Sequence, residues 1–443
     1  MGDAFSRLTN VKREEIPSVL AAAAFFFCIL TALMVIRPAR DALGMQRGIE
    51  EVRWLFYGTA LVTLLANPPF GWLVSRFRRM AFIATTYLFF SASLVGFFLL
   101  MVLAPAAVGV RSGQVFYVWF SVFNLFVTMV FWAMMADRFS LEQSKRFFGV
   151  VAVGGTLGAI FGPFLAGRLA EPLGTPTLLL VAVGFLVLSL VAAWMVARLQ
   201  PEPDATSPVA PGPDEAPAVS ERAVIGGSAW EGFRAVFRSR YLLGITGFAL
   251  IVAVMATFLY FTRLQMVAAL GEDIDMRTRV FANIDLITQI ATLVTQLVIT
   301  GHLMKRLGVS FALALLPITA ALGFIGLAIT GTLAALIVFE ACFRAVQRGI
   351  MRPARETLWT VVSREDKYKA KAFIDTFVYR GGDVAGAQTE GALGKLGFGL
   401  MGLAAFAVPL AVVWGALAVW LGRAQRREAD AWRERAGLPP ELE

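Results

Sequence analysis

Long, continuous apolar segments recur along this chain, and they constrain its fold more than any other feature. A helix needs roughly 20 apolar residues to cross the hydrocarbon core of a bilayer, which is about 30 Å thick. The segments are Pro17–Ile36, Trp54–Ser75, Met80–Leu103, Gly113–Ala136, Phe147–Gly167, Pro176–Ala197, Tyr241–Thr262, Val280–Leu303, Val309–Thr330, Thr332–Met351, Ala372–Leu393 and Gly399–Leu421. Because apolar residues do not alternate with polar ones, the segments predict helices and exclude the strands of a closed barrel. The sequence therefore predicts an all-α membrane protein with about twelve transmembrane helices.

The charged residues also indicate a bilayer and set the orientation of the chain. Charged residues make up 16% of the 443 residues, whereas soluble domains contain about 25%. Lys and Arg gather after the even-numbered segments, and cytoplasmic loops are the ones that carry this excess. We therefore expect a multi-pass protein with both termini in the cytoplasm. The net charge of +9 follows from this distribution and requires no nucleic-acid partner.

The sequence lacks the residue patterns of an enzyme or a cofactor-binding protein. Its two cysteines, Cys28 and Cys342, lie inside apolar segments, and His302 is the single histidine. Two cysteines cannot complete a metal site, and no Gly-x-x-x-x-Gly-Lys phosphate loop is present. The polar first 16 residues and the missing small-residue cleavage site predict that the first apolar segment is a helix and not a signal peptide. We therefore expect no cofactor, no metal and no catalytic activity.

A polar stretch divides the twelve segments into six and six. The sequence PEPDATSPVAPGPDEAPA is rich in Pro, Ala, Asp and Glu, and such a composition cannot bury enough apolar surface to fold. We predict four parts: an N-terminal six-helix bundle over residues 1–198, a flexible cytoplasmic linker over 199–230, a C-terminal six-helix bundle over 231–423 and a cytoplasmic tail over 424–443.

The two halves resemble each other. Gly154-Gly155 corresponds to Gly381-Gly382, Phe147 to Phe373 and Arg37 to Arg263, at nearly the same separation each time. Two parallel six-helix repeats are the plan of the major facilitator superfamily, in which two bundles rock about a midplane site. The fold class predicted is therefore an all-α membrane protein with two six-helix pseudo-repeats of the major facilitator type.

Short basic loops resemble the gates of that superfamily. One follows Gly71-x-Leu73 and the other follows Gly301-x-Leu303. Ser75 and Lys305 stand where the superfamily usually has Asp, so the ion pair that this Asp anchors is not expected here. The residues that we assign to gating are Arg76, Arg79, Lys305, Arg306, Lys369, Lys371 and Asp383.

A polar stripe on the tenth segment is the first candidate for substrate binding. Glu340, Arg344 and Arg348 are spaced four residues apart and share one helix face. Charges inside a bilayer are expensive and mark ion pairs, cavities or transport pathways. The stripe is either an internal Glu340–Arg344 pair or a cavity wall whose arginines bind an anion. Asp285, on the polar face of the eighth segment, is either a helix-packing residue or a proton or counter-ion site.

Further candidates lie in the first, seventh and eleventh segments. In the eleventh segment, two glycines are flanked by Asp375, Arg380 and Asp383, and this pattern predicts a locally loosened helix. The charged residues would either line a cavity or form part of a gate. The first segment ends with Arg37 and Arg40, and the seventh ends with Arg263. These arginines either extend to the membrane interface by snorkelling or line a cavity. The predicted substrate-binding set is Arg37, Arg40, Arg263, Asp285, Glu340, Arg344, Arg348, Asp375 and Arg380. Among the buried candidates, the five arginines (Arg37, Arg263, Arg344, Arg348 and Arg380) outnumber the four acids (Asp285, Glu340, Asp375 and Asp383) by one, which weakly favours an anionic substrate.

Two stretches of the chain resemble the bacterial and plastid ATP/ADP translocase family of nucleotide transporters. The stronger contains Arg352-Pro353-Ala354-Arg355-Glu356 and then Lys369-x-Lys371-x-x-Ile374-Asp375, and the weaker runs from Phe131-Trp132 to Lys145-Arg146-Phe147. The resemblance implies exchange of ATP for ADP in the inner membrane of a bacterium, with intramembrane basic and acidic residues as substrate ligands. The family has an acid in its fourth helix, whereas Gly113–Ala136 has no charge.

Taken together, these features predict a monomeric secondary transporter of organic anions, nucleotides in particular, that works by alternating access without ATP hydrolysis. A proton-coupled carrier of a drug, lipid or metabolite keeps the same fold and would use Asp285 or Glu340 as its proton site. A membrane receptor or scaffold that transports nothing is the third alternative.

Overall fold

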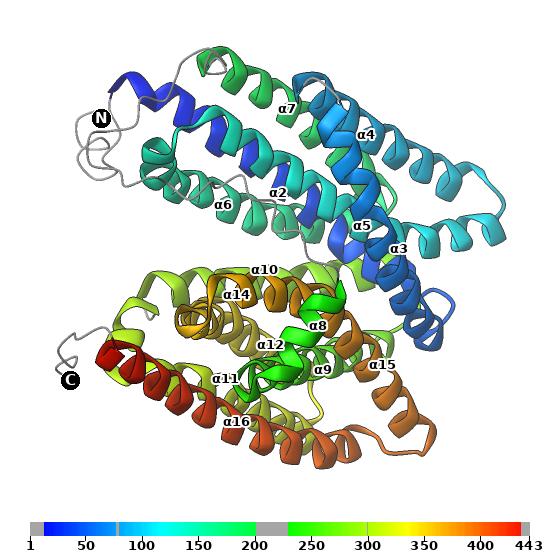
Figure 1. The fold of residues 1–443 in the computed structure, drawn as a ribbon. Coiled ribbons are helices and arrows are strands. Elements are labelled where there is room, and N and C mark those ends of the chain that lie inside the picture. The colour runs from blue at the N-terminus through cyan, green and yellow to red at the C-terminus, as the bar shows by residue number, and fades with distance from the viewer. Residues whose placement is uncertain (1–12, 77–78, 201–228, 299, 436–443) are drawn as a thin grey trace. The chain divides into compact units, whose positions relative to one another are not determined.

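The described part of the chain is helical from end to end. The computed structural model describes residues 13–76, 79–200, 229–298 and 300–435, and the ribbon shows helices joined by short connections (Figure 1). Nine of the described helices are long and apolar enough to cross a membrane. The prediction of an all-α membrane protein is confirmed. The segment predicted as a linker and the last residues of the tail lie largely outside the described residues.

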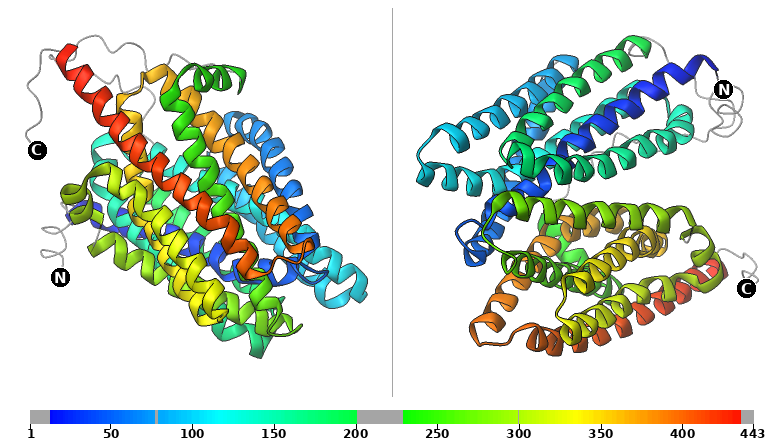
Figure 2. Two further views of the ribbon diagram at one scale, coloured as in Figure 1. Left: turned by 90° about the horizontal axis from the view of Figure 1, so that it is seen from below. Right: turned by 180° about the vertical axis from the view of Figure 1, so that it is seen from behind.

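The first compact unit consists of Met1–Ala223 and Gly271–Leu286. Its helices are α2 (Ile16–Gly44), α3 (Ile49–Arg76), α4 (Arg79–Leu103), α5 (Ala106–Arg138), α6 (Leu141–Leu173), α7 (Thr177–Leu199) and the first half of α10 (Ile274–Val298), after the short turn η1 (Arg13–Glu15). Figure 2 shows α2, in dark blue, running between α6 and α7. Phe25, Ile29 and Leu33 of α2 are fully buried, so α2 forms the centre of this core.

The second compact unit consists of Val224–Leu270 and Ile287–Glu443. Its long helices are α9 (Arg240–Ala268), α11 (Thr300–Thr330), α12 (Leu333–Val346), α15 (Tyr379–Lys395) and α16 (Leu400–Arg435); its shorter ones are α8 (Ala229–Arg238), α13 (Arg352–Thr357) and α14 (Arg364–Phe373). Two π-helical turns, η2 (Gln347–Met351) and η4 (Ile374–Val378), and a 3₁₀ turn, η3 (Leu358–Val361), join the elements after α12. Apolar residues of α9, α11 and α16 build the core, with Phe248 and Trp414 in ring contact.

Glycines let helices of the same unit approach closely. A Cβ atom at Gly154 would collide with the backbone of Ala23, and one at Gly158 with the backbone of Phe27. This contact joins α6 to α2 and shows that these glycines permit close helix packing. It also excludes a large side chain at either position.

The second unit repeats the same contact. Gly382 faces the carbonyl of Leu250, and Gly386 faces the carbonyl of Val254, so α15 packs on α9 as α6 packs on α2. The structure corrects the sequence match by one position, because Gly382 and not Gly381 takes the place of Gly154. A Cβ atom at Gly381 would meet open space.

Several helices extend past the ends predicted from hydropathy, and in α2 and α9 the added turns carry predicted site residues. Residues Arg37, Arg40 and Asp41 lie inside α2, which ends at Gly44, and Arg263 lies inside α9, which ends at Ala268. The expectation that these arginines close their helices is therefore wrong. Hydropathy underestimates the length because the polar residues of these last turns have partners within the protein, so that the helix continues without exposing a charge to lipid.

Candidate functional site

A buried ion-pair cluster on α9 and α12 contains two of the predicted arginines. Arg263 is 0% exposed and Glu340 is 1% exposed. Arg263 Nη1 donates a hydrogen bond to Glu340 Oε1 over 3.1 Å, and Arg344 Nε lies 3.8 Å from the same oxygen. The spacing of Glu340 and Arg344 by one helical turn was visible in the sequence. The third member, Arg263, comes from a helix 77 residues away in the chain.

Arg348, the last residue of the predicted stripe, has a different partner. Its Nη1 donates a hydrogen bond of 2.6 Å to Gln289 Oε1 on α10. Arg348 belongs to the π-helical turn η2, which contains one extra residue per turn and shifts the register of the face that follows. The structure therefore brings Glu340, Arg344 and Arg263 together and directs Arg348 to an amide.

Two arginines of this cluster share one carboxylate. Arg263 and Arg344 both approach Oε1 of Glu340, whose Oε2 is buried and accepts no hydrogen bond within the described residues. Asp383 of α15 also interacts electrostatically with Arg344. A guanidinium group can donate several hydrogen bonds at once, so two such groups beside one carboxylate form a donor-rich site that suits an anion.

A second ion pair joins α2 to the first half of α10 inside the first unit. Arg37 Nε lies 3.7 Å from Asp285 Oδ2, and the carboxylate is the more deeply buried partner. Thr288 and Thr292 on the same helix are also buried. The predicted polar face of α10 is thus turned away from solvent, and Asp285 has the counter-ion that the sequence alone could not identify.

Arg40 lies in an aromatic environment. Its guanidinium pairs with the neighbouring Asp41. It also lies 4.8 Å from the ring centre of Tyr117 and 5.0 Å from that of Phe120, at distances typical of cation–π contacts. This arrangement holds Arg40 against α5.

The three charged residues of the eleventh segment do not form one cluster. Arg380 Nη1 donates to Asp383 Oδ2 over 3.3 Å, and Asp383 Oδ1 accepts from Thr257 of α9. Asp375 is exposed and lies 4.0 Å from Arg355. It belongs to the π-helical turn η4, which ends at Val378. The helix is thus loosened as predicted, but before the glycine pair and not at it.

The stretch that resembles the nucleotide transporters forms a second charged network. Lys371 Nζ donates to Glu356 Oε2 over 2.6 Å, and Arg355 hydrogen-bonds Tyr379. Partial burial raises the pKa of Glu356. The hydrogen bond and charge of Lys371, together with Arg355, lower the pKa by more than burial raises it, so that it lies below the ordinary value of 4.5. These contacts join α13 to α14 and α15. Lys369 is half-buried on α14.

The other predicted gating residues cannot be placed by their side chains. Arg76 ends α3 and Arg79 begins α4, while Lys305 and Arg306 lie on α11. Their side chains are outside the described part of the structure, so their gating role stays a prediction.

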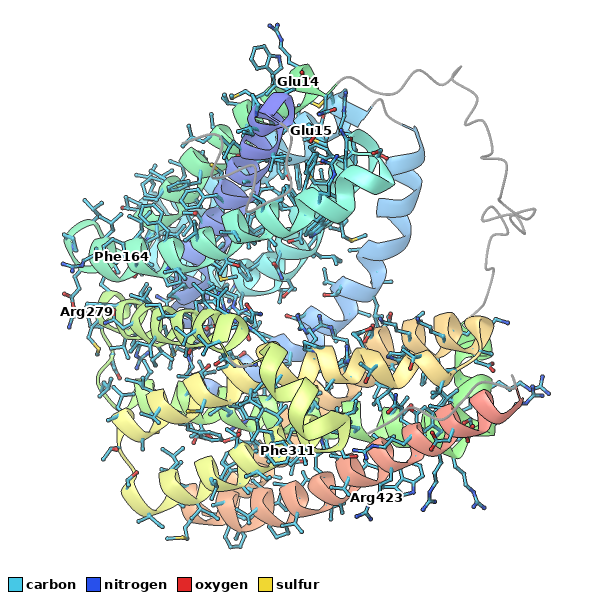
Figure 3. The ribbon with its side chains drawn as sticks, turned by 90° about the vertical axis from the view of Figure 1, so that its left-hand side faces the viewer. Glu14, Glu15, Phe164, Arg279, Phe311 and Arg423 are labelled. Carbon is cyan, nitrogen blue, oxygen red and sulfur yellow. The ribbon has the colours of Figure 1, made fainter. Side chains whose placement is uncertain are left out.

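Three polar contacts of the structure were not predicted from the sequence. Glu390 of α15 is buried and accepts a hydrogen bond from Gln265 of α9. The available signal was a fourth charged residue in the segment Ala372–Leu393, beside Asp375, Arg380 and Asp383, because a charge inside the membrane is costly and marks a partner or a site. In the first unit, the carboxylate of Asp275 accepts from the backbone N–H of Thr175, and Arg279, labelled in Figure 3, pairs with Glu171 at 2.7 Å.

Solved structures of three membrane transporters are similar to this chain. A bacterial homologue of the human lysosomal transporter Spinster matches with a TM-score of 0.59 and 15% identity, over 94% of this chain and 99% of the other. An auto-inhibited peptide transporter of the POT family matches with a TM-score of 0.60 and 14% identity, over 90% and 96%. The nucleoside transporter NupG matches with a TM-score of 0.60 and 10% identity, over 93% and 99%.

At these identities the three structures show the shared fold alone. No curated protein sequence matches the chain. The family model described as Major Facilitator Superfamily matches residues 18–353, which is most of the chain. It includes α2, on which the first unit is centred, and the buried cluster on α9 and α12. The chain belongs to the Major Facilitator Superfamily.

Proposed function

We propose that this protein is a secondary transporter of an organic anion and that it works by alternating access. The observation that carries the proposal is the pair of arginines, Arg263 and Arg344, that converge on the buried carboxylate of Glu340. Guanidinium groups gathered at one point inside the protein offer more hydrogen-bond donors than a single carboxylate can accept. An anionic substrate would supply further acceptors.

The choice of arginine points to the chemical class of the anion. A guanidinium group is planar and can donate two parallel hydrogen bonds to a phosphate or carboxylate. Arginine also stays protonated in proteins, so the positive charge does not depend on pH. Phosphate and carboxylate groups are therefore the anions that such a cluster binds best.

Nucleotides are the first substrates to test. The resemblance of the stretch from Arg352 to Asp375 to the ATP/ADP translocases supports them. The packing of this stretch through Lys371, Glu356 and Arg355 makes it an ordered part of the second unit. Phosphate groups of a nucleotide fit the proposed role of the cluster arginines.

The internal carboxylate favours exchange over free passage. Glu340 occupies Arg263 when no substrate is present, and an incoming anion must compete with it. An anion bound in the cluster adds favourable charge interactions that the empty occluded state lacks, so the loaded occluded state is the more stable one. A carrier of this kind returns most easily across the membrane with a second anion bound.

Uptake into liposomes tests the proposal. Purified protein is reconstituted, and uptake of radiolabelled ATP is measured with and without internal ADP, together with a panel of phosphates and carboxylates. The variant is Arg344→Gln with Arg348→Gln, and the control is Arg234→Gln with Arg238→Gln, an exposed pair on α8 with the same spacing. Loss of two charge-assisted hydrogen bonds, each worth about 1.5–3 kcal/mol, predicts at least a 100-fold fall in apparent affinity for the transported anion.

The outcomes separate the alternatives. Uptake that requires an internal anion and fails only in the cluster variant supports an anion exchanger. Unchanged uptake of every anion in that variant overturns the role of the cluster. Uptake that follows an imposed pH gradient and needs no internal anion would establish a proton-coupled carrier in place of the exchanger.

A further inference from the structure

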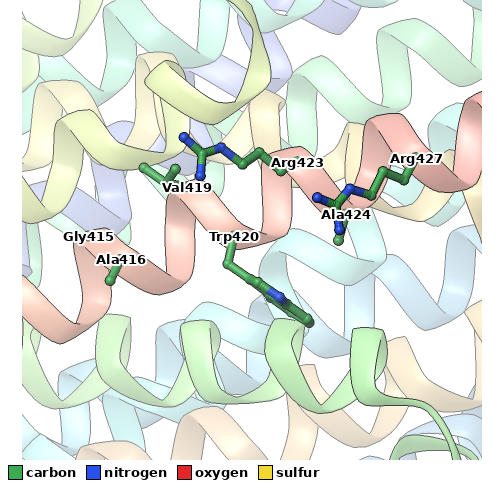
Figure 4. Close-up of a pocket in the computed structure, with 7 residues that line it drawn as sticks. All are labelled: Gly415, Ala416, Val419, Trp420, Arg423, Ala424 and Arg427. Carbon is green, nitrogen blue, oxygen red and sulfur yellow. The ribbon is translucent and has the colours of Figure 1, made fainter.

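A groove runs along the outer side of α16 near its C-terminal end (Figure 4). It has a volume of about 440 Å³. The residues that line it are Gly415, Ala416, Val419, Trp420, Arg423, Ala424 and Arg427. The lining contains two arginines and no carboxylate, and all of it belongs to one helix of the second unit.

The groove is apolar at one end and basic at the other. Gly415, Ala416 and Val419 lie within the apolar segment that ends at Leu421, whereas Arg423 and Arg427 follow it. Small residues at the apolar end leave room beside the helix. The change of polarity along α16 therefore coincides with the predicted boundary between hydrocarbon and water.

Trp420 lies at this boundary. Its side chain is 44% exposed, and its indole ring packs against Gly244 of α9, where a Cβ atom would collide with the ring. Tryptophan is enriched at the level of lipid headgroups, because its ring is amphipathic. The contact with Gly244 fixes the ring as one wall of the groove (Figure 4).

The basic end presents charge that the protein does not neutralise. Arg423 and Arg427 are exposed, stand one helical turn apart and line the same groove. Within the described ranges of the chain, neither has a carboxylate at ion-pair distance. Arg240, one turn before Gly244 on α9, is exposed as well and lies on the face of α9 that Trp420 contacts. Two positive charges thus lie in the groove where the apolar segment ends.

We infer that this groove binds an anionic phospholipid of the surrounding bilayer. Arg423 and Arg427 hold the headgroup phosphate with their planar donor groups, and an acyl chain lies along Ala416 and Val419 beside Trp420. A soluble anion would use the basic end and leave the apolar end empty. The joined apolar and basic halves match a lipid better than a free phosphate, and the site does not depend on what the protein transports.

Native mass spectrometry of the full-length protein in detergent tests this inference. The protein is titrated with phosphatidylglycerol or with phosphatidylcholine of the same acyl chains, and bound lipid is counted. We expect tighter binding of phosphatidylglycerol to wild type. Each arginine near an anionic surface contributes about fivefold to binding, so Arg423→Gln with Arg427→Gln should weaken the first binding event by about 25-fold.

Two further variants separate the groove from general surface charge. Ala416→Phe fills the apolar end without altering charge and should also weaken binding of phosphatidylglycerol. Arg234→Gln with Arg238→Gln removes an equally spaced exposed pair outside the groove and should leave the first binding event unchanged. The melting temperature of each variant in detergent checks that it is folded.

Three results would overturn the inference. The first is equal binding of the two lipids, and the second is an equal loss in the two double-arginine variants. The third is displacement of phosphatidylglycerol by glycerol phosphate at similar concentration, which would make the groove a site for a soluble anion. Loss confined to the groove variants, with no competition by glycerol phosphate, supports the lipid site.

Discussion

The buried pair of Arg263 and Glu340 offers the sharpest test of the structure by mutation. The two side chains are almost fully buried, and their charged atoms lie 3.1 Å apart. At an effective dielectric constant of about 20, unit charges at this distance attract by about 5 kcal/mol. Desolvation costs several kcal/mol for each ion and offsets much of this gain. Removing one partner, however, leaves the other charge buried without its counter-ion, which costs about 3–5 kcal/mol.

We therefore expect Arg263→Met and Glu340→Gln each to lower the free energy of unfolding by about 3–5 kcal/mol. The double variant should lie within about 1 kcal/mol of wild type, since replacing both ions with neutral groups is often nearly neutral. Unfolding of the four proteins in mixed micelles by titration with sodium dodecyl sulfate measures the cycle. Repeating the cycle with Arg344→Gln present isolates the contribution of the third charge.

The result that would refute this reasoning is additivity. If the losses of the two single variants add up in the double variant, the side chains do not interact. If both single variants stay within about 0.5 kcal/mol of wild type, neither charge is buried in the membrane-inserted protein. Either outcome would also remove the cluster from the proposed anion site.

Two further predictions concern packing and pH. Gly158→Ala should lower the free energy of unfolding by about 1–3 kcal/mol, because its Cβ atom would collide with the backbone of Phe27 on α2. The control Gly149→Ala, whose Cβ atom meets open space, should be neutral or stabilising. Chemical unfolding measures both variants, and equal losses would contradict the packing argument. The lowered pKa of Glu356 means that its contact with Lys371 stabilises the folded state fully above the ordinary pKa of 4.5 and loses this effect as the pH falls below it. The melting temperature of the wild type should therefore exceed that of Glu356→Gln near neutral pH but not at about pH 3. A difference in melting temperature that persists at acidic pH would show that the charge of Glu356 is not involved.

The glycine contacts of the two repeated halves could be predicted from the sequence only in part. The glycine pairs of the two halves were correctly recognised as related, since glycines at close helix contacts leave a mark in the sequence. The exact correspondence was wrong by one residue, because only the contact with Leu250 shows that Gly382 is the one that faces the backbone of α9. The amphipathic helix α8 was also assigned in part to the linker, since a ten-residue helix without a long apolar run has a weak signal.

The candidate site could also be predicted from the sequence only in part. The spacing of Glu340 and Arg344 on one helix face is a local property, so the sequence could predict that they lie together. The partners Arg263 and Gln289 come from α9 and α10, and nothing in the local spacing selects them. The sequence alone could only count the arginines and acids of the spans.

What the sequence by itself determined is the class of the protein. An apolar run long enough to cross a bilayer must satisfy its own backbone hydrogen bonds, and it does so as a helix whatever its neighbours are. What only the tertiary structure decided is which charged groups lie beside one another. A buried charge is governed by groups within a few ångströms, and in this chain those groups come from helices that lie far apart in the sequence.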